Sequence, residues 1–363
     1  MDRTLLPRKA IRNLRPCFHG GVWSARDISK PENVIDLSVS INPFGPPKKI
    51  KSLVNRVKLN VYPDMTSYFA RRSLADYHSI SPNNIVIGNG SSELIQAICF
   101  TYLSHGDRVV SFCPTFDEYR RCSQMMSAEY VAMKLLEKNK FTLHVHMFKQ
   151  FIKENNPKII FLCNPNNPTG YYFNEEDFRE ILLECSGRLV VLDEAYVNFV
   201  QNPWNSVSYV KKRNVIILKS MTKDYALTAL RVGYCIADER ICTYLYKILP
   251  PWNVNSLAQE AIRLVIKGKN YLIKTRKKIK EIKSYVQKEL QRLNIDYIPS
   301  EANFILIKIQ RIKNIREFFL KKNILIRDCS SYGLNHYIRV AIHSKKEMDI
   351  FLCVLRDYLA ECL

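Results

Sequence analysis

The sequence contains no apolar run that approaches the length of a membrane-spanning helix. Its first residues, MDRTLLPRKAIRNLRP, lack the sustained apolar core and the small-residue cleavage site of a secretory signal. The eleven cysteines form no CxxC pair and several lie in apolar runs, so we expect reduced, mostly buried thiols rather than a disulfide framework. There is no internal repeat and no low-complexity block. These absences predict a cytoplasmic protein.

Acidic residues are scarce compared with basic ones: 34 Asp and Glu stand against 55 Lys and Arg, a formal net charge of +21. Such a balance suits nucleic acid, an anionic membrane surface or small anionic ligands. The basic residues are spread out. The cluster KTRKKIKEIK at 274–283 falls in a helical pattern that predicts a solvated face, with an apolar stripe formed by Tyr271, Ile273, Ile279, Ile282, Val286 and Leu290. No zinc-finger spacing, RNP-like motif, basic zipper or appended helix-turn-helix is present. Nucleic acid and membranes are therefore not expected as partners, and a non-catalytic basic binding protein remains a distant alternative.

The seven histidines show no spacing with cysteines or acids that would make a metal site, and no metal is expected. His144 and His146 are the only close pair. We interpret them as one face of a strand in the run TLHVH.

Between residues 66 and 240, apolar runs alternate with amphipathic helical patterns. This alternation is typical of an α/β protein with a mostly parallel sheet covered on both faces. After residue 250, a helical stretch over about 255–292 and shorter strands predict a smaller α+β lobe. We expect an N-terminal arm (1–45) that joins the small lobe, a large domain (46–250) and a small domain (251–363). The expected strands are NIVIG, RVVSF, KIIFLCN, RLVVLDE, NVIILK, FILIKI, ILIR and YIRVAI, and the expected helices include SYFARRSLADYH, SSELIQAICFTYL, TFDEYRRCSQMM and EEDFREILLEC.

Two turn motifs follow expected strands of the large domain, at the sheet edge where such folds bind ligands. The first, GNGSSE at 88–93, offers the backbone after Gly90 and the hydroxyls of Ser91 and Ser92 as a phosphate cradle. Such a turn also caps helices for purely structural reasons. The second, NPNNPTG at 164–170, predicts a rigid turn that aims an Asn amide into a site, with a tight connecting loop as the alternative.

Two further motifs carry charge. Asp193, in DEAY, ends a buried strand, where a carboxylate needs a cation such as a protonated pyridine nitrogen. Tyr196 is then placed to donate to a phenolate oxygen. In SMTKDYALTALRVGY at 220–234, Lys223 is a candidate for imine formation. Phosphate ligands would surround it: Ser220, Thr222 and Arg231.

GNGSSE, NPNNPTG, DEAY and SxTK…LRxGY, in this order, resemble the fold-type-I pyridoxal-phosphate enzymes of the aminotransferase superfamily. The resemblance covers nearly the whole chain and implies the fold, a large mostly parallel sheet plus a smaller lobe, and the cofactor pyridoxal 5′-phosphate. It implies Lys223 as the covalent lysine and Asp193 on the pyridine nitrogen. It also implies a homodimer. The remaining implied ligands are Asn167 and Tyr196 on the ring oxygen, Phe116 on the ring face and Tyr62 on the phosphate of the neighbouring subunit.

Candidate substrate anchors lie at both ends of the chain. Arg339, in YIRVAIHS, ends an expected strand and suits a carboxylate, and Arg327, in ILIRDCSSYGL, is a second cation. In the N-terminal arm, His19 and Gly20 begin the turn HGG, and Asn42 lies in SINP. Together these residues predict a small substrate with two anionic groups. The alternative is that each arginine pairs with a surface carboxylate.

The segments HGG, SVSINPFGPP, YPDMTSYF, PPWNVNSLA and ILIRDCSSYGL…YIRVAI resemble the threonine-phosphate decarboxylases of cobalamin biosynthesis. This resemblance implies decarboxylation of O-phospho-L-threonine, or of O-phospho-L-serine, to aminopropanol or ethanolamine phosphate and CO2. Arg339 would orient the carboxylate, and His19, Asn42 and Arg327 would take the phosphate. The loop at 330–333 departs from the family pattern, which leaves both substrates open. Histidinol-phosphate aminotransferases share the cofactor motifs and the final arginine, and they are the alternative.

Overall fold

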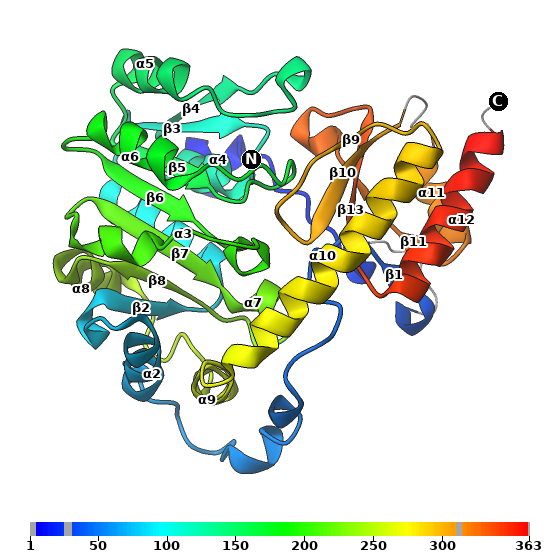
Figure 1. The fold of residues 1–363 in the computed structure, drawn as a ribbon. Helices are drawn as coiled ribbons and strands as arrows, with labels where there is room; N and C mark the ends of the chain where they lie inside the picture. Colours follow the sequence, from blue (N-terminus) through cyan, green and yellow to red (C-terminus); the bar gives the residue numbers. More distant parts are fainter. Residues whose placement is uncertain (1–4, 25–30, 310–313, 362–363) are drawn as a thin grey trace.

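The computed structural model describes residues 5–24, 31–309 and 314–361, and a seven-stranded sheet dominates it (Figure 1). The strand order is β2-β8-β7-β6-β5-β3-β4, and β8 runs antiparallel to both of its neighbours, whereas the other pairs are parallel. The fold is therefore the fold-type-I α/β architecture with a mostly parallel sheet. The strands are β2 (Ile85–Gly88), β3 (Arg108–Cys113), β4 (Glu129–Lys134), β5 (Ile159–Cys163), β6 (Leu189–Asp193), β7 (Val215–Ser220) and β8 (Gly233–Ala237).

Helices cover both faces of this sheet, which explains why its central strands β5, β6 and β7 are uninterrupted apolar runs until their carboxyl ends. Successive strand residues point to opposite faces. Ile160 and Leu162 of β5 join one core, whereas Ile159 and Phe161 join the other. The first core is closed by α2 (Tyr68–His78), α5 (Val145–Asn155), α6 (Glu175–Leu183) and α9 (Ser256–Val265), and the second by α3 (Ser91–Tyr102), α4 (Glu118–Met125) and α8 (Glu239–Ile248).

A four-stranded antiparallel sheet of order β12-β13-β10-β9 forms the core of the second part of the molecule. The N-terminal arm reaches this part, because β1 (Ile35–Asp36) pairs in parallel with β11 (Ile324–Leu325). Helix α10 (Lys269–Arg292) connects the two parts (Figure 1). It contributes to the first core of the large sheet and to the core of the four-stranded sheet. The other elements are α1 (Lys9–Arg12), α7 (Met221–Asp224), α11 (Ile315–Lys321), α12 (Lys345–Glu361), β9 (Tyr297–Ile298), β10 (Phe304–Lys308), β12 (Arg327–Asp328) and β13 (Tyr337–Ala341).

Three expectations from the sequence are wrong. The histidines of TLHVH do not lie on a strand: His144 precedes α5 and His146 lies in its first turn. The stretch 255–292 forms two helices. Helix α9 ends at Val265, and α10 begins directly after Gly268. Ile273, assigned to the apolar stripe of that stretch, is 60% exposed. The helical character of the basic cluster at 274–283 is confirmed, and Lys274, Lys277, Lys278 and Lys280 are exposed, whereas Lys283 is partly buried and donates to Ser300 O and Ala302 O.

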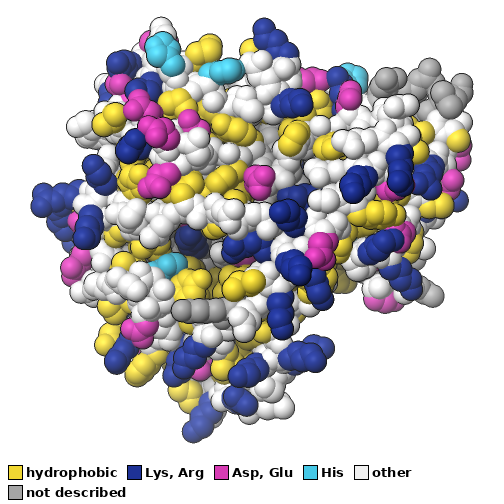
Figure 2. Space-filling model, viewed as in Figure 1, with side chains coloured by type: hydrophobic (Ala, Val, Ile, Leu, Met, Phe, Trp, Pro, Cys, Tyr) yellow, Lys and Arg dark blue, Asp and Glu magenta, His cyan; other side chains and the backbone are white. Residues whose placement is uncertain are grey.

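The surface carries the positive charge diffusely. On the face shown in Figure 2, lysines and arginines are scattered over both parts of the molecule, among acidic side chains. Within the described ranges, no helix is both long and apolar enough to cross a membrane.

Candidate functional site

A cavity of about 710 Å³, the main cavity, lies at the carboxyl ends of β5, β6 and β7. The N-terminal arm and the antiparallel sheet complete its walls. It brings together most of the residues that the sequence singled out, from segments more than 300 residues apart. These residues are His19, Gly20, Ser91, Ser92, Phe116, Asn167, Asp193, Tyr196, Ser220, Thr222, Lys223, Arg231, Arg327 and Arg339.

One end of the main cavity is rich in hydrogen-bond donors. Helix α3 begins at Ser91, and the N–H groups of its first turn have no acceptor within the helix. Gly90, just before it, has φ +84, and a Cβ there would lie 2.9 Å from Arg231 Nη2, so glycine lets the guanidinium approach the turn. The hydroxyls of Ser220 and Thr222 lie 2.8 Å apart. These groups form an anion cradle.

Asp193 is buried at the end of β6 without a cationic partner in the part of the chain that the structure describes. Its Oδ2 accepts a hydrogen bond from the Tyr119 hydroxyl at 2.7 Å, and Oδ1 accepts one from Ala195 N at 3.0 Å. Burial raises the pKa of Asp193 to about 6, and the charge of Glu194 acts in the same direction. A cation beside Asp193 would stabilise the ionised carboxylate and lower its pKa again.

Lys223 lies in α7, the short helix that follows β7. Burial, with the charges of Arg339 and Arg231, lowers the pKa of Lys223 to about 8. No hydrogen bond or ion pair of its Nζ occurs among residues 5–24, 31–309 and 314–361. A buried amine with a lowered pKa is a nucleophile at moderately basic pH.

Only one asparagine of NPNNPTG faces the main cavity. The amides of Asn164 and Asn166 bond within the fold, to Phe173 O at 3.1 Å and to Pro114 O at 2.9 Å. Asn167 instead lines the cavity, and its Oδ1 accepts a hydrogen bond from Arg339 Nη1. The loop is rigid because its own side chains hold it, which leaves Asn167 as the residue aimed at the site.

Two aromatic side chains, Phe116 and Tyr196, line the main cavity. Phe116 packs edge-on against Tyr119, with ring centroids 5.7 Å apart. Tyr196 packs edge-on against Phe304 at 5.2 Å, and burial raises the pKa of its phenol well above the usual value. Tyr196 therefore remains a hydrogen-bond donor at neutral pH.

Arg327 and Arg339 are buried, and they are direct cross-strand partners in the β12–β13 pair. Arg339 Nη2 donates to Ser38 O at 2.7 Å, and Arg327 Nη2 donates to Phe18 O at 2.8 Å and to Ser331 Oγ at 2.9 Å. No carboxylate pairs with either guanidinium within the described residues, and Arg327 Nη1 and Arg339 Nε have no partner there. The surface-pairing alternative is thus wrong for both, and the cavity holds two buried positive charges in need of an anion.

The N-terminal arm forms the outer wall of the main cavity. His19 Nε2 lies 3.2 Å from Glu118 Oε1. Although burial opposes it, hydrogen bonds from His19 and Arg121 lower the pKa of Glu118 to about 2. The ring of Phe18 covers the guanidinium of Arg327 at 4.4 Å. The arm is therefore held against both parts of the molecule.

Two site predictions lie away from the main cavity. Asn42 does not line it, and its Nδ2 donates to Asp224 O, Tyr271 Oη and Thr275 Oγ1. Asn42 is therefore not available to a substrate phosphate, and this prediction is wrong. Tyr62 is 76% exposed on the outer surface and stacks on Trp252 at 4.5 Å.

Sequence reasoning missed Tyr119, which lies among charged residues of the expected helix TFDEYRRCSQMM. It also missed Tyr332, whose hydroxyl lies 3.5 Å from Asn167 Oδ1. Tyr119 follows Phe116 by three residues on the edge of α4. Phe116 precedes the helix and lines the cavity, and Tyr119 packs edge-on against its ring without lining the cavity.

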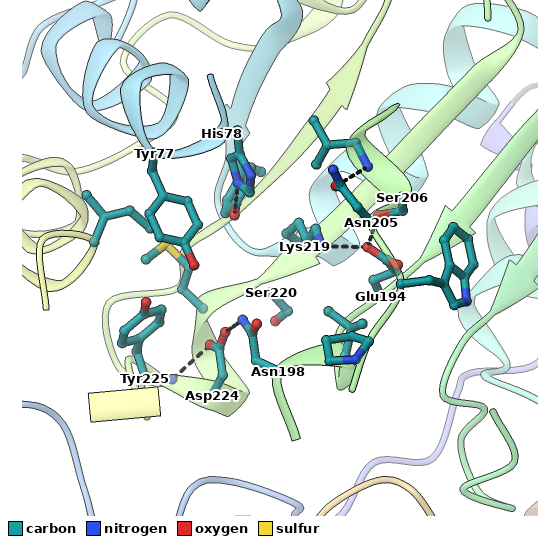
Figure 3. A pocket seen from close by; sticks show the side chains of 17 residues that line it. Tyr77, His78, Glu194, Asn198, Asn205, Ser206, Lys219, Ser220, Asp224 and Tyr225 are labelled. Carbon is teal, nitrogen blue, oxygen red and sulfur yellow. Dashed lines mark hydrogen bonds and ion pairs between the residues drawn. The ribbon is translucent and has the colours of Figure 1, made fainter. Parts of the chain in front are cut away.

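A second cavity of about 150 Å³, the rear pocket, shares Ser220 with the main cavity (Figure 3). Lys219 and Glu194 form an ion pair of 2.5 Å on its wall, and Asn198 donates to Asp224 Oδ2 at 2.5 Å. Burial raises the pKa of Asp224 to about 6. Helix α7 thus presents Lys223 to the main cavity and Asp224 to the rear pocket.

Comparisons of the sequence agree with this geometry. The family model "Aminotransferase class I and II" matches residues 32–355. The chain is 34% identical to a histidinol-phosphate aminotransferase of Caldanaerobacter subterraneus subsp. tengcongensis, over 86% of this chain and 88% of the relative. It is also 34% identical to the histidinol-phosphate aminotransferase of Moorella thermoacetica, over 97% of this chain and 93% of that one.

Solved structures share the architecture. A histidinol-phosphate aminotransferase from Clostridium acetobutylicum superposes with a TM-score of 0.83 at 27% identity, covering 90% of this chain and 99% of the other. An L-threonine-O-3-phosphate decarboxylase from Porphyromonas gingivalis superposes with a TM-score of 0.78 at 23% identity, covering 90% and 100%. At that identity the second likeness shows the fold alone.

Proposed function

This chain belongs to the aminotransferase class I and II family, and we propose that it transfers the amino group of histidinol phosphate to a 2-oxo acid such as 2-oxoglutarate. It depends on pyridoxal 5′-phosphate, as this family does. The substrate assignment rests on relatives at 34% identity over most of both chains, which are histidinol-phosphate aminotransferases. The decarboxylase expected from the sequence becomes the second candidate.

The residues of the main cavity fit the cofactor. Its phosphate suits the cradle formed by Ser91, Ser92, Ser220, Thr222 and Arg231. Its pyridine nitrogen suits Asp193, whose buried carboxylate lacks a cation, and its ring oxygen suits Asn167 and Tyr196. Phe116 would flank the ring, and Lys223 would hold the aldehyde carbon covalently. We propose these roles on chemistry and shared cavity alone.

When bound, the cofactor supplies an electron sink for the bond broken at the substrate carbon that carries the amine. The protein supplies orientation and proton transfer. Asp193 would keep a proton on the ring nitrogen. Lys223 Nζ, whose pKa is lowered to about 8, would accept the proton from the substrate carbon that carries the amine. It would then deliver this proton to the carbon that was the aldehyde carbon of the cofactor. The buried phenol of Tyr196 would donate a hydrogen bond without ionising.

The observation that carries the proposal is the buried cross-strand pair Arg327–Arg339. Two like charges opposite each other on adjacent strands are unfavourable unless an anion lies between or beside them. Histidinol phosphate carries its phosphate next to the amine-bearing carbon, and 2-oxoglutarate carries carboxylates. Both substrates of the transamination are therefore anions that the same two arginines can bind in turn. The apolar wall formed by Phe18, Trp23 and Ile41 suits the imidazole end.

A second candidate is decarboxylation of O-phospho-L-threonine or O-phospho-L-serine. The observation that favours it is that the two unpartnered guanidinium nitrogens belong to different arginines, which are held by different segments. A phospho-amino acid would present its carboxylate to Arg339 and its phosphate to Arg327 at the same time. His19, beside Arg327 on the arm, would support the phosphate.

The test is to incubate the cofactor-loaded protein with histidinol phosphate and 2-oxoglutarate, with O-phospho-L-threonine and with O-phospho-L-serine, and to measure glutamate and CO2. Glutamate from the first mixture and no CO2 from the others is the expected result. CO2 without glutamate would overturn the proposal in favour of the second candidate. Neither product, in a protein that binds the cofactor, would contradict both.

We also propose that the chain acts as a homodimer in which Tyr62 reaches the cofactor phosphate of the neighbouring subunit. An exposed apolar cluster supports this proposal, because monomers rarely expose such clusters. Leu59 is 81% exposed, Val61 56% and Met65 57%, and the ring pair of Tyr62 and Trp252 lies in the same region. Sedimentation of the wild type and of Val61→Glu would test this, with a monomeric wild type as the contrary result.

A cytoplasmic location is the remaining proposal from the sequence. The cysteines that the structure describes are all free thiols, and most of them are buried. Such usage suits a reducing compartment. Thiol titration of protein purified without reductant would test it, because disulfides formed inside the cell would lower the count of reactive thiols after unfolding.

A further inference from the structure

We propose that Asn42 is a positioning residue that fixes the backbone carrying Lys223. The inference rests on the proposed role of Lys223 and deepens it, because it assigns the placement of the lysine to a residue far away in the sequence. Asn42 lies in the N-terminal arm and is 2% exposed. It contacts the helix of Lys223 but not the main cavity.

The need for such a residue follows from the shortness of α7. Helix α7 spans only Met221–Asp224, so the carbonyls near its end have no N–H partner within the helix. Asn42 satisfies two of them. Its backbone N–H donates to Lys223 O at 2.9 Å, and its Nδ2 donates to Asp224 O at 2.7 Å. A distant segment thus caps the turn on which the lysine stands.

Asn42 is itself held from a third element. Its Nδ2 lies 2.8 Å from Tyr271 Oη and 3.2 Å from Thr275 Oγ1, both on α10. Its Oδ1 accepts a hydrogen bond from Phe44 N at 3.1 Å. Every polar atom of the side chain is therefore engaged, which is the pattern of a residue that fixes geometry rather than one that binds a ligand.

The opposite side of α7 is held independently. Asp224 Oδ2 accepts from Asn198, and Asp224 Oδ1 accepts from Tyr225 N at 2.8 Å (Figure 3). The ring of Tyr225 stacks on that of Tyr271, which Asn42 also contacts. Without the Asn42 side chain, α7 would keep its bonds on the rear-pocket side and the backbone bond from residue 42 to Lys223 O, but Asp224 O would lose its partner on the side of the arm. The expected consequence is a displaced lysine in a folded protein.

The experiment uses the full chain with two substitutions at this position, Asn42→Ala and Asn42→Asp. The matched control is Asn214→Asp. Asn214 Nδ2 also caps two backbone carbonyls, Cys185 O and Arg188 O, each at 2.9 Å, but it does not line the main cavity. All variants are compared with wild type in three respects: thermal unfolding of the apoprotein, the pH midpoint of the visible absorbance of bound pyridoxal phosphate, and kcat and KM.

We expect all three variants to unfold at lower temperature than wild type. At a temperature where all are folded, only the Asn42 variants should shift the pH midpoint of the absorbance band. They should also lower kcat on the order of 10- to 100-fold, the effect of an ångström-scale misplacement, with KM close to that of wild type. The Asn214 control should keep the midpoint and kcat of wild type.

An unchanged midpoint and kcat in both Asn42 variants, despite lowered unfolding temperatures, would overturn the inference and assign Asn42 a structural role alone. The proposed function would survive that result, because wild type would still show the band and the activity. A wild type that never develops the band would overturn the cofactor proposal and the inference with it.

Discussion

The hydroxyl of Tyr119 donates to Asp193 Oδ2 at 2.7 Å, and both residues are buried, although only Asp193 lines the main cavity. The ring of Tyr119 is itself fixed by stacking on Phe161 at 4.6 Å. The tyrosine therefore orients a carboxylate that has no cation of its own. Hydrogen bonds of this kind, to a charged group in a poorly solvated site, are the strong ones.

Removing this hydroxyl with Tyr119→Phe should weaken cofactor binding. A hydrogen bond to a charged group contributes about 1.5–3 kcal/mol, which corresponds to roughly 10- to 150-fold in Kd. Titration of the apoprotein followed by visible absorbance measures it. Tyr246→Phe is the control, since Tyr246 Oη donates to Ile85 O at 2.9 Å away from the cavity. Equal losses of affinity in both variants would contradict the role of Tyr119.

The contribution of Asp193 to the stability of the apoprotein should fall as the pH rises from 4 to 7, whereas that of His78, whose pKa is lowered to about 3 by burial and by the charge of Lys219, should rise. Burial raises the pKa of Asp193 to about 6 from its ordinary 3.8, so the folded state holds the proton more tightly than the unfolded state. The stability that this proton contributes is present below pH 3.8 and is lost as the pH rises through about 6. The loss approaches about 3 kcal/mol at neutral pH.

Asp193→Asn should remove this contribution and abolish tight cofactor binding. Urea unfolding of the apoprotein at pH 4.5 and pH 7 measures the difference. Relative to its value at pH 4.5, the free energy of unfolding at pH 7 should be higher in the variant than in wild type, because the contributions of Asp224 and His78 are present in both proteins and cancel in the comparison. An equal change with pH in both proteins would show that Asp193 does not titrate in this range.

Arg327→Met in the cofactor-loaded protein should raise KM for the phosphorylated substrate while leaving the unliganded protein as stable or more stable. The variant removes one of two like charges that lie opposite each other without a carboxylate. Inorganic phosphate should raise the Tm of the loaded wild type by preferential binding, and this gain should vanish in the variant. Arg356→Met, which loses only an ion pair with Glu289, is the control and should keep the gain.

Incorporation of the cofactor into the apoprotein should speed up with pH and level off above about pH 8. The neutral amine of Lys223 is the reactive form, and its pKa is lowered to about 8 by burial and by the charges of Arg339 and Arg231. The rate at pH 7 should be about a tenth of the plateau. Rapid-mixing absorbance between pH 6 and 9.5 measures it.

Arg339→Met tests whether Lys223 is the group that titrates in this pH–rate profile. Removing a positive charge near Lys223 should raise the pKa of the lysine, so the rise in the incorporation rate should move to higher pH. A rise that moves to lower pH would contradict the assignment of the titration to Lys223.

The fold could be predicted from the sequence wherever burial on both faces produced uninterrupted apolar runs, as in β5 and β6. The sequence did not indicate β4, because an edge strand that is only partly buried mixes polar and apolar residues in EYVAMK. It also did not indicate β8, because GYCIA is a run of only five residues that follows the loop of Arg231 directly.

The candidate site likewise contains residues that local motifs indicate and residues that they do not. Residues at the ends of strands converge because the topology forces them together, so Asp193 and Lys223 were found from local motifs. Asn42 was misassigned because its partners on α7 and α10 are 182 to 233 residues away, and no local pattern encodes such a contact. Tyr119 was missed because a tyrosine on a helix face packs in the core more often than it serves a site.

The arm and the antiparallel sheet meet through contacts that span almost the entire chain. Phe18 O accepts from Arg327 across 309 positions, and Ser38 O accepts from Arg339 across 301. On a ribosome, the first of each pair therefore emerges long before the second. The large sheet can assemble while translation continues, whereas the wall with the two arginines exists only after residue 339 has left the exit tunnel. The contacts that hold the two arginines against the arm therefore form late in synthesis, after the large sheet has its complete sequence.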